Sequence, residues 1–513
     1  MRAPAGLVPL VVLFALFAAY VAAFPNHLGD SDEPLILYEA TRLQRGAVMY
    51  RDVFEIVTPG SQYLFAGLFA LFGATLTTAR LAMAALQAGI AVLIIVAARR
   101  CAAGWLLAIA AGAAHLALGQ PTWPYASPHW LSTFLLMLAL VVALGRPWRD
   151  GPRGALGLGA VLGVLAMVQQ QKAAMLLPAV ALAIVADRLI DRRFGAAPAP
   201  GAALPRLLLG LIGGTALVVL PAMAAILASA GVEPVFEALI RHPLLNYGTL
   251  HNASARWGAV SIFSWPLARY TFPALLRWQP LVLAIVAGRA AVLWRRGVEA
   301  AELRRWMTLL CFAGGAIASI SYFPDFIHLA FIAPLFAVAA AALLALGLRR
   351  VPRPIAAAAA LALLAALALQ AGRNLRRAHA THPIQAQTPF GRIDLRSATP
   401  LEAAAEMNRL LPPDEPREVF CYPECPMLYL LAGTDNPTPF QKLQAGYNSP
   451  SVVQAAIDAV AARRPPLAFG WFVVEGDPVT RYVLEHYTRV GDSLFYVRRP
   501  EPPADRSRPS PGS

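Results

Sequence analysis

Apolar runs long enough to cross a lipid bilayer recur through the first 371 residues of this chain. Examples are Gly6 to Phe24, Leu81 to Ala98 and Leu207 to Ala228. The chain is 58% hydrophobic and only 14% charged, with a mean hydropathy of +0.55, whereas soluble domains have about 25% charged residues. Since a helix of about 20 apolar residues spans the hydrocarbon core, we predict a polytopic α-helical membrane protein with about 11 spans in residues 1–371.

The basic residues lie in short groups between the apolar runs. With the amino end inside, every group falls on the cytoplasmic side, as the positive-inside rule requires. The net charge of +14 therefore reflects membrane orientation, and no nucleic-acid partner is expected. Lysine is nearly absent, which suggests a GC-rich bacterial genome and hence a multi-pass protein of the bacterial inner (cytoplasmic) membrane. The groups are Arg99 and Arg100; Arg146 and Arg149; Arg188, Arg192 and Arg193; Arg295 and Arg296; Arg349 and Arg350.

The first long polar interruption runs from Gly29 to Leu64, inside a predicted first periplasmic loop of residues 25–80. Four of the 29 acidic residues lie close together in its first part, namely Asp30, Asp32, Glu33 and Glu39. Carboxylates beside a membrane are costly unless they bind or react with something. One of them can stabilise the start of a helix, but three in a row exceed that need. We therefore predict that Asp32, Glu33 and Asp30 are catalytic, as general base or as metal ligands.

The same loop is predicted to contain two helices that lie along the membrane interface. Ser31 or Asp32 can cap a helix that has Pro34 in its first turn and ends at Gly46. A second apolar segment, Ser61 to Gly73, is too short to cross the bilayer comfortably. A second periplasmic loop is expected at residues 229–279.

After about Gly372 the pattern changes to short strands that alternate with amphipathic helices, which predicts a periplasmic α/β domain over residues 372–500. Thr399 and Glu402 form a capping box with Pro400 at the first helical position, and this box predicts a helix through Leu411. Cys421 and Cys425 lie in this domain and are placed to form a disulfide. Residues 501–513 are predicted to be a disordered tail.

The motifs of the first loop resemble those of the GT-C superfamily of membrane glycosyltransferases. Within it they are most similar to the glycosyltransferase 39-like group, which holds protein O-mannosyltransferases and aminoarabinose transferases of lipid A. The matching residues are Asp32-Glu33, Gly46, Tyr50-Arg51-Asp52, Thr58-Pro59-Gly60, Phe72-Gly73 and Arg80. The resemblance implies an inverting transfer of a sugar from a polyprenyl-phosphate carrier to a periplasmic acceptor, which is a glycan, a lipid or a protein. It also implies that Asp32 acts as the base and that Glu33 orients the acceptor.

Cations at the outer membrane face are needed to stabilise the phosphate that leaves in such a reaction. Lys172 is the first candidate, although a lysine at the end of a span also snorkels without binding anything. Asp325 and His328 share one helical face and are predicted to bind substrate, or merely to cap the helix. The other predicted substrate-binding residues are Tyr50, Arg51 and Arg80 in the first loop and Arg241, His242 and Arg256 in the second.

No nucleotide-binding fingerprint stands out, and the scattered carboxylates and histidines do not specify a metal. A divalent metal therefore stays open, and no other cofactor is expected. The alternative function is a transporter or flippase of lipid-linked sugars. Transporters carry charged or broken helices at mid-membrane, whereas here the charges are predicted to cluster at the outer face, which favours the enzyme.

Overall fold

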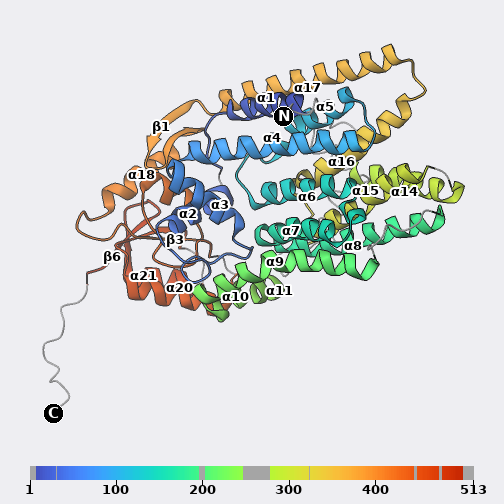
Figure 1. The fold of residues 1–513 in the computed structure, drawn as a ribbon. Coiled ribbons are helices and arrows are strands. Elements are labelled where there is room, and N and C mark those ends of the chain that lie inside the picture. Colours follow the sequence, from blue (N-terminus) through green and yellow to red (C-terminus); the bar gives the residue numbers. More distant parts are fainter. Residues whose placement is uncertain are drawn as a thin grey trace, which may run out of the picture.

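A computed structural model describes residues 7–29, 32–195, 203–246, 278–297, 299–322, 324–443, 448–472 and 476–500. Long helices dominate it, and a small domain of strands and short helices follows at the carboxyl end (Figure 1). The long helices are α1 (Leu7–Ala22), α4 (Leu76–Arg100), α5 (Trp105–Ala114), α6 (Pro128–Leu144), α7 (Pro152–Val168), α8 (Gln170–Arg193), α9 (Leu204–Ala230), α14 (Gln279–Arg296), α15 (Ala300–Ser319), α16 (Phe326–Leu348) and α17 (Arg353–Thr381).

Five of the described helices are long and apolar enough to cross a membrane, namely α4, α8, α9, α16 and α17. Four shorter apolar helices accompany them: α1, α3 (Gly60–Phe72), α6 and α7. The prediction of a polytopic helical membrane protein is confirmed, while the count of about 11 spans stays a prediction.

Small residues let α7 and α9 pack with their backbones in contact. A Cβ added at Gly159 of α7 would lie 2.0 Å from the carbonyl oxygen of Leu211, and one at Gly214 of α9 would lie 2.0 Å from that of Leu156. Close approach through glycine is a common way to pair helices in a membrane, where the hydrophobic effect does not drive association.

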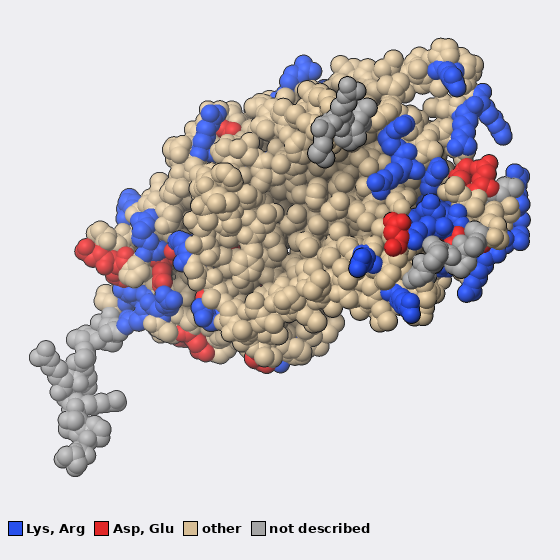
Figure 2. All heavy atoms as spheres, in the orientation of Figure 1, with Lys and Arg blue, Asp and Glu red and all other residues tan. Residues whose placement is uncertain are grey.

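The arginines gather at one end of the helix bundle, which we call the arginine-rich end (Figure 2). Two buried aspartates of α8 accept ion pairs there from neighbouring segments. Asp187 lies 3.1 Å from Arg149 and 2.8 Å from Arg304, and Asp191 pairs with the same two arginines. The network ties α8 to α15 and to the turn η3 (Pro147–Asp150). The predicted segregation of the basic groups to one side agrees with this arrangement.

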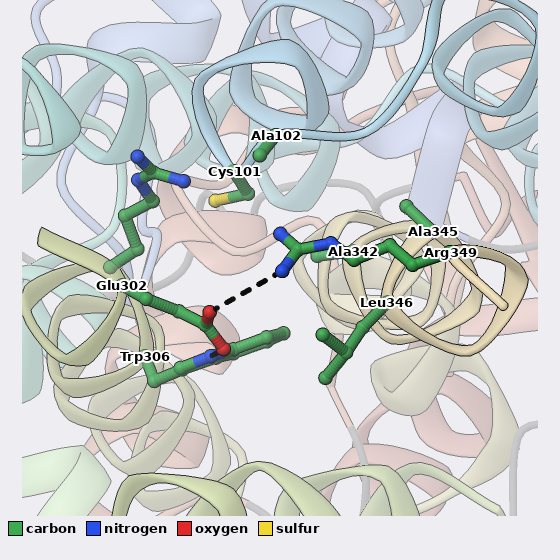
Figure 3. Close-up of a pocket in the computed structure, with 9 residues that line it drawn as sticks. Cys101, Ala102, Glu302, Trp306, Ala342, Ala345, Leu346 and Arg349 are labelled. Atoms are coloured by element: carbon green, nitrogen blue, oxygen red, sulfur yellow. Dashed lines mark hydrogen bonds and ion pairs between the residues drawn. The ribbon is translucent and has the colours of Figure 1, made fainter. Parts of the chain in front are cut away.

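A water-sized pocket of about 10 Å³ also lies at the arginine-rich end (Figure 3). Glu302 faces Arg349 across it at 3.9 Å, and its carboxylate also accepts a bond from Trp306 and pairs with Arg289 at 2.8 Å. Because this carboxylate is matched by two guanidinium groups, the pocket is a structural ion-pair cluster rather than a reaction site.

The first loop folds at the opposite end, between the bundle and the carboxyl-terminal domain (Figure 1). Its helix α2 (Asp32–Gln44) packs against α3 on one side and α19 (Pro426–Ala432) on the other. The rings of Tyr38 and Tyr429 stack across the second contact at 4.7 Å. Nine of the 13 residues of α2 are buried, so the helix lies inside the protein and fixes the two parts against each other.

The carboxyl-terminal domain contains a hairpin, β1 (Ile384–Thr388) and β2 (Gly391–Leu395), and a four-stranded sheet in the order β3-β4-β6-β5. The sheet strands are Val419–Tyr422, Leu467–Gly470, Phe495–Arg498 and Tyr487–Arg489 in that order. β3 pairs with β4 in parallel, and the other pairs are antiparallel. Helices α18 (Thr399–Leu410), α20 (Pro450–Arg463) and α21 (Pro478–His486) complete the domain. The predicted small α/β domain is confirmed, and Cys421 and Cys425 form a disulfide.

Two sequence expectations at this junction differ from the structure. α17 continues through the predicted domain boundary at 371 and ends only at Thr381. The helix predicted from Thr399 is present, but Ala398 is its N-cap and no side-chain capping bond forms. Thr399 is already helical there, so its side chain does not take the N-cap position that the capping box requires.

Candidate active site

Glu33 is the centre of a buried hydrogen-bond cluster that fixes the start of α2. Its carboxylate pairs with Arg80 through both oxygens and accepts bonds from the backbone N–H groups of Gly29, at 2.9 Å, and Ala126, at 2.7 Å. Arg80 also donates to the carbonyl oxygen of His27. Only 1% of Glu33 is exposed. The structure thus brings together two predicted site residues, Glu33 and Arg80, as partners of each other.

Replacing Arg80 with Met is expected to lower the free energy of unfolding by about 3–5 kcal/mol, because Glu33 would be left as a buried charge without its partner. Denaturant unfolding of the purified protein in detergent measures this loss. Arg376, exposed on α17, provides the control, and Arg376→Met should change stability by less than about 0.5 kcal/mol. An Arg80→Met protein as stable as the native chain would show that the pair does not hold the loop.

Three further carboxylates lie close together beside this cluster. Asp32 is exposed at the first position of α2, and Glu39 is fully buried one to two turns later, where Gln62 donates to it at 3.1 Å. Burial raises the pKa of Glu39, and the nearby Glu55 raises it further. Burial likewise raises the pKa of Glu55 to about 7, with a contribution from the negative charge of Asp32. Glu39 and Glu55 therefore keep their protons to a higher pH than ordinary carboxyl groups do.

The contribution of Glu55 to stability should fall as the pH rises from about 4.5 to about 7, because Glu55 binds its proton more tightly when folded than when unfolded. We expect Glu55→Gln to remove part of this dependence, so the melting temperature of the variant should change less between pH 5 and pH 8. Other groups, such as the neutral His27, contribute to the pH dependence of stability with the opposite sign. They are present in both the native protein and the Glu55→Gln variant, so their contributions cancel when the two are compared. Glu485→Gln, at an exposed position of α21, should keep the native pH dependence; identical curves for Glu55→Gln and the native protein would contradict the assignment.

The loop that carries Glu55 is fastened to the start of α8 by Gln170. The Gln170 side chain accepts from the backbone N–H of Thr58 at 3.0 Å and donates to the carbonyl oxygen of Ile56 at 2.9 Å. The Thr58 hydroxyl donates to Ala166 at 2.7 Å. A Cβ at Gly60 would lie 2.5 Å from the carbonyl oxygen of Met167. The Thr-Pro-Gly motif therefore has a physical reason: its threonine bonds to α7, and its glycine lets α3 approach α7.

Lys172 lies two residues beyond Gln170 and is 1% exposed. Its ammonium group donates to the hydroxyl of Ser132 at 2.7 Å. That hydroxyl in turn contacts Gln169 at 2.7 Å, and the amide of Gln169 lies 3.0 Å from the Nδ1 atom of His129. Among the described residues no carboxylate lies within 4 Å of the Lys172 nitrogen. A buried cation that has only neutral partners is poised to bind an anion.

His129 connects the Lys172 cluster to Asp325 and His328. The rings of His129 and His328 meet edge to face at 4.8 Å. His328 bonds to Asp325 through its ring at 2.8 Å and to Tyr322 at 3.2 Å, and its backbone N–H is capped by Asp325 at 2.8 Å. The pair therefore caps α16, which was one of the two roles considered from the sequence. It is linked to Lys172 only through His129, Gln169 and Ser132, and its role in binding substrate stays a prediction.

The other predicted site residues lie at or near this end but have partners of their own. Arg51 is exposed and pairs with Asp52 at 2.8 Å, and the hydroxyl of the buried Tyr50 donates to Val57 at 2.8 Å. Arg241 pairs with Glu237 at 2.6 Å and Glu233 at 3.0 Å on the turn η4 (Glu237–Arg241) and the short helix α10 (Val232–Phe236) before it. His242 is buried edge-on against Phe54 at 5.4 Å. Asp30 and Arg256 lie outside the described residues.

Sequence reasoning missed several residues that the fold brings to the site. They are Glu55, Gln62, Ser132, His129, Gln169, Gln170 and Lys442. One signal was available in the printed sequence: lysine occurs only at positions 172 and 442. Lys442 lies 3.4 Å from Glu424 and its charge acts on Glu55. Both lysines of an arginine-rich chain therefore lie at this end of the molecule.

In the described part of the chain, no group of three or more His, Cys, Asp and Glu side chains is placed so that it could hold a metal ion. The carboxylates that cluster here instead bind amides, arginine or a proton.

The structure resembles two solved membrane glycosyltransferases of the GT-C type. ArnT from Cupriavidus metallidurans, bound to undecaprenyl phosphate, superposes with a TM-score of 0.51 at 15% sequence identity, over 95% of this chain and 97% of that one. The apo oligosaccharyltransferase of Archaeoglobus fulgidus has a TM-score of 0.50 at 13% identity, over 90% of this chain and 69% of that one. No family model and no curated protein matches the sequence. The chain thus has the GT-C fold, which confirms the fold expected from the motifs of its first loop.

Proposed function

We propose that this protein is an inverting glycosyltransferase that moves a sugar from a polyprenyl-phosphate carrier to an acceptor hydroxyl at the periplasmic face of the bacterial inner membrane. The observation that carries the proposal is that groups of opposite charge lie at the same end of an apolar bundle. Carboxylates of the first loop and the buried Lys172 lie on either side of the segment that Gln170 fastens. The known ligand of the similar ArnT structure, undecaprenyl phosphate, is a carrier of this class.

An apolar groove beside the site suits the carrier's hydrocarbon tail. It has a volume of about 350 Å³ and is lined by Pro59, Gly60, Tyr63 and Met167 on one side and by the last turns of α9 on the other. The groove begins at the Thr-Pro-Gly segment. A prenyl chain in it would bring its phosphate to the membrane surface next to the charged residues.

The reaction then needs two functions, which the two sides of the site supply. Asp32 takes the proton of the acceptor hydroxyl as its oxygen attacks the anomeric carbon. The bond from that carbon to the phosphate oxygen breaks, and the phosphate leaves on the carrier with the bonding electron pair. Lys172 stabilises the negative charge that develops there, while Glu33 and Arg80 hold the start of α2 in place. Asp325 and His328 position groups near the same phosphate.

Incubation of the purified protein with several undecaprenyl-phosphate sugars, with and without envelope glycolipids, tests the proposal. We expect one donor to be consumed and its sugar to appear on an acceptor, with undecaprenyl phosphate released in equal amount. Mass spectrometry of the extracted lipids measures both products. A protein that moves intact carrier-linked sugar across a vesicle membrane and cleaves none of it would overturn the proposal in favour of a flippase.

A further inference from the structure

The largest cavity described lies between the first loop and the carboxyl-terminal domain, and neither the catalytic carboxylates nor the tail groove accounts for it. Its volume is about 600 Å³, within the usual range for pockets that bind small organic molecules. Residues of the first loop, the β2–α18 segment and α19 line it, and Pro34 on its wall is two residues from Asp32. The cavity thus adjoins the start of the helix that carries the proposed base.

We propose that this cavity binds the saccharide part of the acceptor, as a neutral polyhydroxyl group. The inference rests on the proposed function and deepens it by naming the chemical class of the acceptor. Three properties of the wall support it: its hydrogen-bond acceptors, its ring faces and its balance of charge.

The wall offers hydrogen-bond acceptors without matching donors. Asp394 is 5% exposed, and its Oδ2 atom accepts from the backbone of Asn26 at 2.7 Å. Its Oδ1 atom is buried, has no hydrogen-bond partner among the described residues and forms a long ion pair with Arg392 at 3.8 Å. His27 donates through Nδ1 to Pro25 at 3.2 Å, which leaves a lone pair on Nε2. Burial and the charge of Arg80 lower the pKa of His27 to about 3, so the ring stays neutral. The hydroxyl groups of a ligand would supply the donors that these acceptor atoms need.

Aromatic side chains of the cavity wall lie next to these hydrogen-bond acceptors. His27 stacks on His382 at 4.4 Å and meets Tyr125 edge to face at 5.3 Å, and Phe469 lines the cavity as well. A sugar combines hydroxyl groups with C–H faces, so it can use both the polar atoms and the rings.

The charges of the wall are close to balanced, which favours a neutral ligand. The guanidinium group of Arg396 lies on the cavity wall and already donates a hydrogen bond to the ring of His382 at 3.2 Å. Glu424 is paired with Lys442 at 3.4 Å. The charge of Lys442 also acts on Glu55, and Pro34 on the cavity wall is two residues from Asp32, so the cavity lies close to the carboxylates of the first loop. A saccharide bound in the cavity therefore lies beside the groups that would activate its hydroxyl.

Saturation-transfer NMR on the full-length protein in detergent tests this with three neutral disaccharides: N,N′-diacetylchitobiose, maltose and trehalose. A serine- and threonine-rich peptide is the competing probe. Thr399 and Ser397 are exposed residues that line the cavity, so Thr399→Trp and Ser397→Trp should fill it without disturbing the core. Ala405→Trp is the matched control, because Ala405 is exposed on the same helix as Thr399 but does not line the cavity.

We expect at least one disaccharide to show saturation transfer, with its affinity about tenfold weaker in both cavity variants and unchanged in the control. Equal signals in all four proteins, or no disaccharide signal in the native protein, would overturn the inference; a peptide signal that only the cavity variants lose would point to a protein acceptor instead. The measurement needs no turnover. Saccharide binding without donor cleavage would therefore count against the proposed function alone, and donor cleavage without saccharide binding against this inference alone.

Discussion

Asp32→Asn is expected to slow sugar transfer by about 100- to 10,000-fold, the usual contribution of a positioned general base. Asparagine keeps the size of the side chain and can still stand at the start of α2, where Asp32 is exposed. The variant should therefore fold and still bind the carrier. The rate of release of undecaprenyl phosphate in the presence of acceptor is the measurement.

Asp458→Asn is the control for this experiment, since Asp458 is an exposed carboxylate on α20 far in sequence from the loop. It should leave the rate unchanged. If Asp32→Asn transfers sugar at the native rate, the base is a different group, and Glu55 becomes the first alternative because its pKa of about 7 suits it to exchange protons at neutral pH.

Lys172→Met should lower the transfer rate by about 100- to 1,000-fold, comparable to the loss of one charge-stabilising donor at a reacting oxygen. The same change should leave the protein as stable as before or raise its melting temperature. A buried ammonium group without a carboxylate partner destabilises the fold, and methionine fills a similar volume without that cost. A residue that loses activity and gains stability on substitution serves function rather than folding.

Two companion variants make this result specific. Lys172→Arg retains a positive charge and should recover part of the rate, whereas Arg192→Met, at the exposed far end of α8, should change neither rate nor stability. A Lys172→Met protein that transfers sugar normally but melts at a lower temperature would assign Lys172 a structural role.

The sequence predicted the elements whose signals are local. The apolar runs indicated the membrane helices, and the Thr-Pro-Gly motif marked a segment that proves to contact α7 through Thr58 and Gly60. The acidic cluster marked a loop that the fold places between the helix bundle and the carboxyl-terminal domain, and its catalytic role stays a prediction. Lys172 stood out because it is a cation at the end of an apolar run, and the fold indeed buries it.

What the sequence did not predict depends on contacts between distant residues. Glu55 looks like an ordinary polar loop residue until the fold buries it beside Asp32 and Glu39. Lys442 is almost 400 positions from the carboxylates it faces. The short helix α19 has only 7 residues, too few to be stable alone, and it exists because Tyr429 packs on Tyr38. Glu33 was predicted by its type, but its pairing with Arg80 is a property of the fold.

The backbone contact between α7 and α9 has a consequence for the lipid that the groove can accept. Where Gly159 and Gly214 meet the opposite helix, no side chain separates the two, so no rotamer change can widen or narrow the gap. The groove lies farther along the same two helices, between Met167 of α7 and Ala222 to Ser229 of α9. The distance between its two walls is therefore set by a contact between backbones, and a carrier tail that binds there, as proposed, would meet helices that are held at a constant separation.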